Sequence, residues 1–326
     1  MKLVVQIPCF NEGATLATTL AEIPQKIEGI DEIEILVIDD GSVDDTIEVA
    51  KTNGVKQICR HVANRGLGRA FRTGLHNALV LGADIIVNTD GDGQYVGSDI
   101  AKLVQPVLSG QADIVIGDRQ TATNPEFGFA NKFMQWLGSR VVRSLSGANV
   151  PDAVSGFRAI SRQAAMDLNI LSTFSYTIEM IIQAANKQMA IVSLPVETNP
   201  KTRESRLYKH IPQFVARQAV GTIRMYAMYR PMRFFFYIGA VLSASGIAPI
   251  LRFVYLYFSG DGDGNIQSLV IGSALLTMGF MVLVAGLLSD LVSQNRQLTE
   301  LALARIRAME LDGNAQQGRV TKGQDS

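Results

Sequence analysis

The stretch NTDGDGQY, from Asn88 to Tyr95, places two carboxylates two residues apart, with a glycine after each. The apolar run ADIIV leads into it and predicts a buried strand that ends where the acidic residues begin. Carboxylate and carbonyl oxygens are the ligands that Mg²⁺ or Mn²⁺ selects. Asp90, Asp92 and Gln94 are therefore candidate ligands of a divalent cation, which could bridge the oxygens of a diphosphate leaving group.

The same residues also approach the pattern of a calcium-binding EF-hand loop. From Asn88 the sequence gives N-x-D-x-D-G, and Asp99 stands at the twelfth position. That loop normally begins with Asp, ends with Glu and follows a helix, whereas here the lead-in is typical of a strand. A plain Asp-Gly turn is the simplest structural alternative. A membrane-tethered calcium-binding module stays open as a non-enzymatic hypothesis.

Composition excludes several other kinds of protein. The chain of 326 residues has equal numbers of acidic and basic residues, which disfavours a nucleic-acid binder with a broad basic field. Two cysteines, Cys9 and Cys59, cannot build a disulfide framework and fit a reducing, cytosol-facing domain. The three histidines show no metal-ligand spacing. The N-terminal residues do not resemble a signal peptide and predict a first strand.

Up to about residue 210, strand-like runs alternate with helix-like stretches, which favours an α/β fold with a mostly parallel, doubly wound sheet. The predicted strands are LVVQIP, EIEILVIDD, ADIIVNTD, ADIVIGD and IVSLPVE. The predicted helices are the segment from Glu12, DTIEVAK, the stretch after Gly68, and DIAKLVQPVLSG. Ligands bind beyond the carboxyl ends of such strands, where PCFNEG, DDGSVDDT and TDGDGQ fall.

These motifs in order, PCFNE, VIDDGSVDDT, NRGLGRA, TDGDGQ, IGDR, DAVSGFRA and TRESRL, resemble glycosyltransferase family 2. Within that family, the chain is most similar to dolichyl- or polyprenyl-phosphate sugar synthases of the dolichol-phosphate mannose synthase type. The resemblance spans roughly residues 3–210. It implies a GT-A fold with a Rossmann-like nucleotide-binding architecture, inversion at the sugar carbon, a nucleotide sugar such as GDP-mannose or a UDP-hexose, and Mg²⁺ or Mn²⁺.

The resemblance also assigns nucleotide-binding residues. They are Pro8, Phe10, Glu12, Asp40, Asp90 and Gly91. Phe10 stands where the family usually has Tyr, so it keeps a ring face for the base without the hydroxyl. Asp40 could accept a hydrogen bond from the ring N–H of the base, or it could cap a turn. The NRGLGRA loop either contacts phosphate or is a plain strand-to-helix turn.

For the reaction itself, the resemblance assigns Asp92, Arg119 and Arg203 as catalytic residues, with Asp90, Asp92 and Gln94 at the metal. It assigns the acceptor phosphate to Lys132, Ser155, Arg206 and Lys209. The family pattern has an arginine in place of Lys132 and a serine in place of Trp136. Arg119 could instead be a surface residue, and the basic cluster before the membrane could be solvated or contact anionic lipids.

Two apolar runs, Phe234 to Phe258 and Ile266 to Leu288, each exceed the about 20 residues that span a bilayer. Buried helices of a soluble protein are the alternative. We expect a GT-A domain over 1–210, an interfacial amphipathic segment over 211–232, two transmembrane helices over 233–290, and a cytoplasmic tail over 291–326. Basic residues flank the pair of runs, and the SGDGDGN connector has none. Positive residues favour the cytoplasm, so both termini are predicted there, in the cell or endoplasmic reticulum membrane.

A polyprenyl phosphate acceptor is already anionic, so its attack on a sugar needs alignment and no general base. The predicted partners are a nucleotide sugar, a polyprenyl or dolichyl phosphate and the bilayer, with no nucleic acid; a homo-oligomer stays open. A rival transferase acting on a hydroxyl of a lipid-linked glycan would need a base, for which Asp152 is the candidate. A nucleotidyltransferase would have a Gly-rich, Arg-bearing loop in place of PCFNEG. The missing Q-x-x-R-W motif disfavours a processive polysaccharide synthase.

Overall fold

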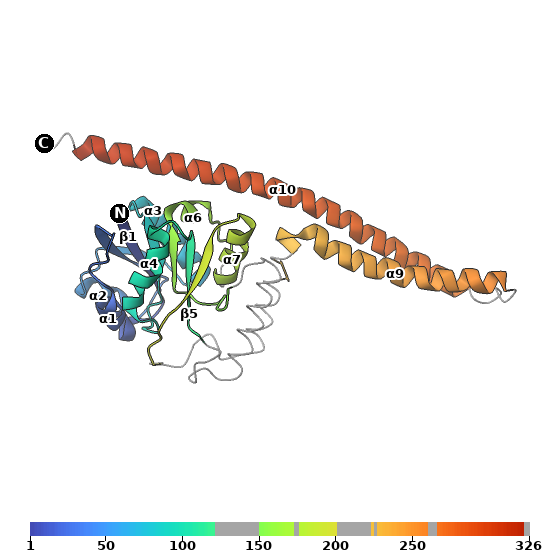
Figure 1. Cartoon of the computed structure of the whole chain (residues 1–326), viewed down its shortest axis with the longest axis horizontal. Coiled ribbons are helices and arrows are strands. Elements are labelled where there is room, and N and C mark those ends of the chain that lie inside the picture. The colour runs from blue at the N-terminus through green and yellow to red at the C-terminus, as the bar shows by residue number, and fades with distance from the viewer. Residues whose placement is uncertain (121–149, 173–175, 201–222, 225–226, 260–265, 323–326) are drawn as a thin grey trace. The chain divides into compact units, whose positions relative to one another are not determined.

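The structure, a computed structural model of the whole chain, describes residues 1–120, 150–172, 176–200, 223–224, 227–259 and 266–322, with side chains to residue 311 (Figure 1). It divides into two compact units. The first combines Met1–Val215 with Ala302–Ser326, and the second is Ala216–Leu301. The candidate site lies in the first unit.

A seven-stranded sheet forms the centre of the first unit (Figure 1). Its strands are β1 (Lys2–Cys9), β2 (Glu32–Asp39), β3 (Gln57–Arg60), β4 (Ile85–Asn88), β5 (Ile114–Asp118), β6 (Arg158–Ser161) and β7 (Ile191–Pro195). They lie in the order β3-β2-β1-β4-β6-β5-β7. β6 runs antiparallel to both of its neighbours, and the other strand pairs are parallel. The sheet is therefore mixed, within an α/β fold of the GT-A type.

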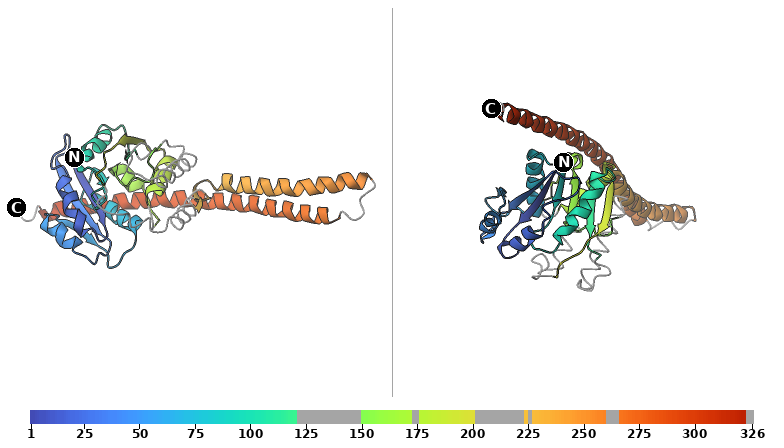
Figure 2. Two further views of the ribbon diagram at one scale, coloured as in Figure 1. Left: turned by 90° about the horizontal axis from the view of Figure 1, so that it is seen from below. Right: turned by 60° about the vertical axis from the view of Figure 1, so that its left-hand side comes forward.

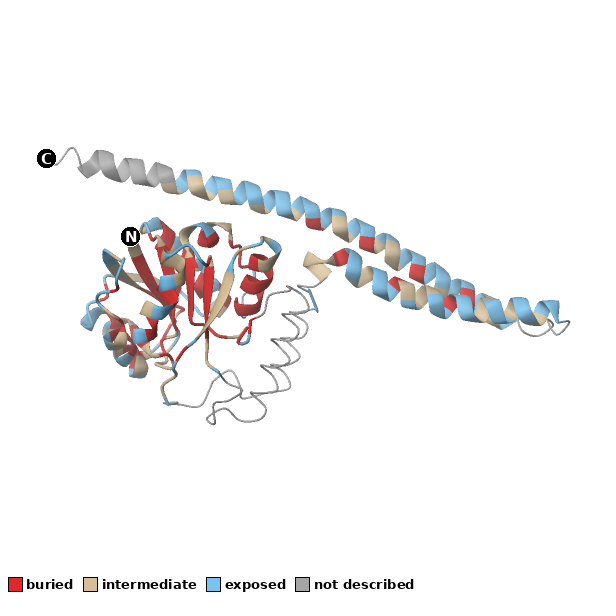
Figure 3. Cartoon of the chain, viewed as in Figure 1, coloured by how far each residue is buried: buried red, intermediate tan, exposed pale blue. Residues whose placement is uncertain are grey.

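Helices cover both faces of the sheet, which explains why its central strands are apolar on both sides (Figure 3). On one face Leu3, Val5 and Ile7 of β1 join a buried cluster with residues of α1 (Gly13–Glu22) and α4 (Ile100–Leu108). The opposite face carries α3 (Leu67–Val80), whose Gly74 packs against Gln6 and Ile38. The helices α2 (Thr46–Thr52), α6 (Arg162–Asp167) and α7 (Thr177–Asn186) complete the elements of this part.

The five strands predicted from apolar runs are confirmed as β1, β2, β4, β5 and β7. Two strands were missed. β3 and β6 have only four residues each, and β6 begins with the charged Arg158, so neither gives a clear apolar run. The four predicted helices are confirmed as α1, α2, α3 and α4. Gly66, at φ 90°, turns the chain into α3 through a conformation that glycine adopts at little cost.

The second unit contains α9 (Pro231–Phe258) and the greater part of α10 (Ile266–Lys322). By length and composition alone, both helices could cross a membrane. α9 begins with Pro231 in its first turn, where proline is well tolerated, and it continues through Pro249 without a break. α10 does not end with the apolar run at Leu288 but continues as a polar helix.

Glycines let α9 and α10 lie side by side in this unit (Figure 2). A Cβ atom on Gly246 of α9 would lie 2.7 Å from the carbonyl oxygen of Gly272 in α10. A Cβ atom on Gly239 would lie 2.8 Å from Leu283 Cγ and 3.0 Å from the Gly279 carbonyl oxygen. Small residues at such positions permit the close backbone approach that drives helix association in lipid.

Candidate active site

The loops that follow β1 and β2 are held together by side-chain hydrogen bonds. The backbone N–H of Asn11 donates to Ser42 Oγ at 2.8 Å, and that of Glu12 donates to Thr46 Oγ1 at 2.9 Å. In return, Asn11 Oδ1 accepts from the Val43 N–H at 2.9 Å. Asn11 has a φ of 54°, a left-handed conformation that Asn tolerates better than most residues. The PCFNEG and DDGSVDDT motifs therefore form one edge of the candidate site.

The acidic loop lies beside this edge, directly after β4. Thr15 Oγ1 of α1 donates to the Gly91 carbonyl oxygen at 2.9 Å, and this hydrogen bond fixes the loop to α1. A Cβ atom on Gly91 would lie 2.9 Å from Cys9 Sγ, so the close approach requires glycine at this position. Asp92 Oδ1 accepts from the Gln94 N–H at 3.1 Å. The predicted ligands thus lie on one ordered loop at the carboxyl end of β4.

Acidic side chains lie close to the buried Asp90 carboxyl group. Burial and the neighbouring Asp92 carboxylate raise the pKa of Asp90 to about 7, and Glu12 adds to the increase. The positive charges of Arg119 and Arg158 act in the opposite direction. A divalent cation would relieve this repulsion, so the residues present fit a metal held by two carboxylates. No cluster of three or more His, Cys, Asp or Glu residues suited to a metal occurs within the described ranges.

The Gly156 peptide lies against the Asp90 carboxylate. A Cβ atom on Gly156 would be 2.8 Å from Asp90 Oδ2, so only glycine fits without displacement. Its N–H donates to Tyr95 Oη at 3.0 Å. Its carbonyl oxygen accepts from Asn88 Nδ2 at 2.9 Å and from Tyr176 Oη at 3.1 Å. Three buried side chains therefore fix this peptide at the acidic loop.

A fully buried arginine supports the same segment from within the core. Arg158 donates to the carbonyl oxygens of Ala153 and Ser155, both at 2.9 Å, and to that of Thr177 at 2.8 Å. Its guanidinium lies 5.7 Å from the centre of the Tyr176 ring, a cation–π distance. Burial lowers the pKa of Arg158. The hydrogen bonds show that Arg158 holds the DAVSGF turn, a role that the sequence analysis did not predict.

Arg119 and Asp152 form an ion pair with two contacts. Arg119 Nε donates to Asp152 Oδ2 at 2.7 Å, and Nη2 donates to Oδ1 at 3.0 Å. Asp152 is fully buried and the Arg119 side chain is 13% exposed. The Arg119 charge also reaches Asp90, whose pKa it lowers. The pairing makes Asp152 a poor candidate for a general base, because Arg119 occupies both of its carboxylate oxygens and the side chain is buried.

Asp40 organises the NRGLGRA loop. Its carboxylate accepts from the backbone N–H groups of Arg65 at 3.0 Å and Gly66 at 2.8 Å. It also lies 2.6 Å from His61 Nδ1, and His61 Nε2 lies 3.0 Å from Thr73 Oγ1. These contacts fit the turn-capping alternative for Asp40. Its contact with a nucleotide base remains a prediction.

Of the remaining predicted residues, some lie within the described part of the chain and others outside it. Pro8 lies in β1, and Phe10 is 37% exposed in the loop that follows. Ser155 is fully buried, and its hydroxyl accepts from the Phe157 N–H at 3.3 Å. Four predicted residues lie outside the described part of the chain: Lys132, Arg203, Arg206 and Lys209. Their roles stay predictions.

Asn199, which the sequence analysis missed, ties the segment after β7 to the acidic loop. Its backbone N–H donates to the Gln94 carbonyl oxygen at 2.9 Å, and its Nδ2 donates to the Gly93 carbonyl oxygen at 3.1 Å. The same Nδ2 contacts Glu22 Oε1 at 3.2 Å. Nothing in the spacing of VETNPKTRESRL indicated these contacts. They place the described residues after β7 beside the candidate metal loop.

The structure does not support an EF-hand loop at Asn88. A strand, β4, precedes the loop, where an EF-hand has a helix. Asp99, the candidate twelfth ligand, accepts instead from the Glu197 N–H at 2.7 Å and pairs with Lys102 at 2.6 Å. The acidic pair is therefore part of the α/β site.

Comparison with known proteins identifies the family. The model for glycosyl transferase family 2 matches residues 4–168, just over half of the chain. The chain belongs to glycosyltransferase family 2. It is 29% identical over 206 residues to the undecaprenyl-phosphate mannosyltransferase of Micrococcus luteus, covering 60% of this chain and 83% of that protein. It is 32% identical over 219 residues to the UDP-N-acetylglucosamine–dolichyl-phosphate N-acetylglucosaminyltransferase of Methanococcus voltae, covering 59% and 83%.

A solved structure supports the fold. Glucosyl-3-phosphoglycerate synthase of Mycobacterium tuberculosis, crystallised with Mn²⁺, UDP and glucosyl-3-phosphoglycerate, matches with a TM-score of 0.54 and 20% identity. The match covers 68% of this chain and 79% of that one. The molecule is thus a family 2 glycosyltransferase with a GT-A fold, followed by two apolar helices of membrane-span length.

Proposed function

We propose that this glycosyltransferase moves a sugar from a nucleotide sugar to a polyprenyl or dolichyl phosphate, with inversion, on the cytoplasmic face of a membrane. The observation that carries the proposal is the acidic loop, where Asp90, with Asp92 beside it, lies against the fixed Gly156 peptide. The names of the two curated relatives support the acceptor class, since both act on lipid phosphates. The two apolar helices fit an enzyme with a lipid acceptor.

In this proposal Asp90, Asp92 and Gln94 hold a divalent metal against the donor diphosphate. Mg²⁺ or Mn²⁺, when bound, would neutralise charge on the diphosphate as it leaves. Phe10 and Glu12, on the adjoining loop, contact the nucleoside. The Gly156 turn lies against Asp90, with no room for a side chain at that position. In the proposal the sugar therefore faces backbone, not a side chain, beside Asp90.

The acceptor oxygen carries its own negative charge, so the chain needs to align it and screen it from the donor phosphates. In the proposal Arg119 contributes positive charge beside Asp90 while it stays paired with Asp152. The predicted basic residues of the TRESRL segment, led by Arg203, would meet the two phosphates. Asn199 anchors the chain that leads into that segment.

The rival acceptor is a hydroxyl group of a lipid-linked glycan, and its attack would require a base. Asp152 was the candidate, and it is fully buried in its ion pair with Arg119. This pairing favours the phosphate acceptor, because a phosphate oxygen needs no proton removed.

The direct test compares acceptors in membranes that contain the full-length protein. Each of several radiolabelled nucleotide sugars is offered with Mn²⁺ and either polyprenyl phosphate or the matching polyprenol. We expect an organic-extractable, acid-labile product with the phosphate and none with the alcohol. Transfer only to a lipid-linked glycan added in a third reaction would contradict the proposal and favour the hydroxyl acceptor.

A further inference from the structure

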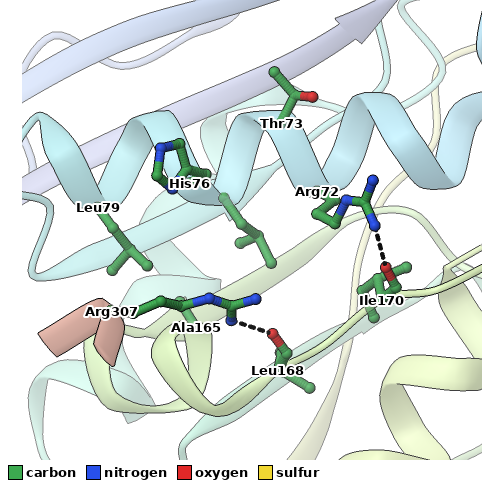
Figure 4. Close-up of a pocket in the computed structure, with 9 residues that line it drawn as sticks. Arg72, Thr73, His76, Leu79, Ala165, Leu168, Ile170 and Arg307 are labelled. Atoms are coloured by element: carbon green, nitrogen blue, oxygen red, sulfur yellow. Dashed lines mark hydrogen bonds between the residues drawn. The ribbon is translucent and has the colours of Figure 1, made fainter. Parts of the chain in front are cut away.

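A hollow lies on the α3 and α6 face of the first unit, and no residue of the acidic loop lines it (Figure 4). Its volume is about 310 Å³. Leu75, Leu79 and Leu168 contribute apolar walls, and the basic side chains of Arg72, His76 and Arg307 line the same space. The catalytic proposal uses none of these basic groups, so the inference below does not rest on that proposal.

The two arginines come from distant parts of the sequence. Arg72 lies on α3, and Arg307 lies on the C-terminal part of α10, which belongs to the same compact unit. Arg72 Nη1 donates to the Ile170 carbonyl oxygen at 3.4 Å. Arg307 Nη1 donates to the Leu168 carbonyl oxygen at 3.0 Å (Figure 4). It also donates to the Met166 carbonyl oxygen at 3.2 Å. These carbonyl groups hold both guanidinium groups at the rim of the hollow.

The charges at the hollow are unbalanced. No acidic residue is among those that line it in the described part of the chain. Burial lowers the pKa of Arg307, and the nearby Arg72 charge lowers it further. Glu310, one helical turn after Arg307, acts in the opposite direction but does not line the hollow. The fold therefore brings like charges together without a carboxylate between them.

The simplest alternative is that the arginines only cap the carbonyl end of α6, as basic residues often do at helix C-termini. That role uses Nη1 of each guanidinium, whereas each group has five N–H donors in a planar fork. Capping also gives no reason for His76 to share the space. Two guanidinium groups and an imidazole beside apolar side chains are suited to bind an anion that carries an apolar part.

We propose that this hollow binds the phosphate group of a small phosphorylated ligand, with Arg72 and Arg307 as its ligands and the leucine wall against the apolar part. A phosphate dianion balances two guanidinium charges and accepts their paired N–H donors. The same chemistry is offered by an anionic phospholipid headgroup or by a phosphate compound in solution. The test below separates these sources.

The test measures how fast phenylglyoxal, an arginine-selective reagent, modifies each arginine of the full-length protein, read by peptide mass spectrometry. One arm compares sodium phosphate with sodium chloride at equal ionic strength, in detergent. The other compares nanodiscs of phosphatidylcholine alone with nanodiscs that also contain phosphatidylglycerol. At a phosphate concentration of twice the dissociation constant, modification of Arg72 and Arg307 should slow about threefold.

Arg305 is the matched control, because it is an exposed arginine on the same helix that does not line the hollow. Protection of Arg72 and Arg307 by phosphate supports the proposal with a soluble ligand, and protection only by phosphatidylglycerol supports it with a lipid headgroup. R72Q should remove the protection of Arg307 while the thermal transition is retained. The proposal fails if neither addition protects the pair, if Arg305 is protected equally, or if Arg307 stays protected in a folded R72Q variant.

Discussion

Gly156 occupies a restricted position in the site, because its backbone lies against the Asp90 carboxylate and is fixed on both sides by hydrogen bonds. Gly156→Ala would place a methyl group 2.8 Å from Asp90 Oδ2. Displacement of the acidic loop by a fraction of an ångström should lower the transfer rate by about tenfold or more. The measurement is the initial rate of sugar transfer at saturating donor.

Gly54→Ala is the control for that change. It also adds a methyl group, but Gly54 has open space around it and lies in the turn after α2. Its φ of 80° makes alanine strained there, so stability should fall slightly while the transfer rate is kept. Equal rates in the Gly156→Ala variant and the wild type would contradict the role of Gly156 in the site.

The Arg119–Asp152 pair can be tested as a unit. Arg119→Met leaves the buried Asp152 charge uncompensated and should cost about 3 kcal/mol in the free energy of unfolding. The double variant Arg119→Met with Asp152→Leu removes both charges and should recover most of that loss. Chemical denaturation of the detergent-solubilised chain, followed by circular dichroism, measures both. An Arg119→Met variant with unchanged stability would show that the pair does not support the fold.

The sequence predicted the candidate metal ligands but not the groups that position their loop. Asp90, Asp92 and Gln94 were recognisable because they lie within five residues of one another. The contacts of Gly156 with Asn88 join residues that are 68 positions apart. They depend on the antiparallel register of β4 and β6, in which Asn88 pairs with Arg158, and no local pattern encodes that register.

At the scale of elements, apolar runs identified five strands and four helices, while short or polar elements escaped. α10 continues beyond its apolar run because the polar sequence after Leu288 remains favourable to helix. Arg296 and Glu300, for example, form an i,i+4 ion pair at 3.6 Å. The antiparallel strand β6 was hidden because Arg158, its first residue, is charged, although carbonyl oxygens satisfy its guanidinium in the core.

The close packing of α9 and α10 gives a prediction at this scale. Gly246→Leu would place a Cβ atom 2.7 Å from the Gly272 carbonyl oxygen and 2.7 Å from the Leu276 backbone nitrogen of α10. The helices should separate, and amide hydrogen exchange in α9 should accelerate about tenfold in detergent micelles. Val241→Leu, at an exposed position of α9, is the matched control and should leave exchange unchanged. Unaltered exchange in the Gly246 variant would contradict glycine-mediated packing.

At the scale of the whole molecule, the predicted orientation places the connector between the helices outside the cytoplasm. A cysteine in place of Ser259, at the end of α9, should react with a membrane-impermeant maleimide in intact cells. A cysteine in place of Gln297, in α10 beyond the second apolar run, should react only after the cells are permeabilised. The native Cys59, which is partly exposed, reports on the catalytic unit in the same experiment, whereas Cys9 is buried and should stay unlabelled. The opposite labelling pattern would overturn the proposed orientation.

In the proposed reaction, sugar transfer to a lipid phosphate depends on a metal that Asp90 and Asp92 would hold. The most direct measurement is the rate of transfer to polyprenyl phosphate as Mn²⁺ is titrated into EDTA-treated membranes containing the wild type, Asp92→Asn or Glu28→Gln. Glu28→Gln changes an exposed carboxylate away from the site and should match the wild type. Asp92→Asn should need more Mn²⁺ and stay about 100-fold slower at saturation. Metal-independent transfer, or an Asp92→Asn curve that overlays the wild type, would contradict a catalytic metal site at Asp90 and Asp92.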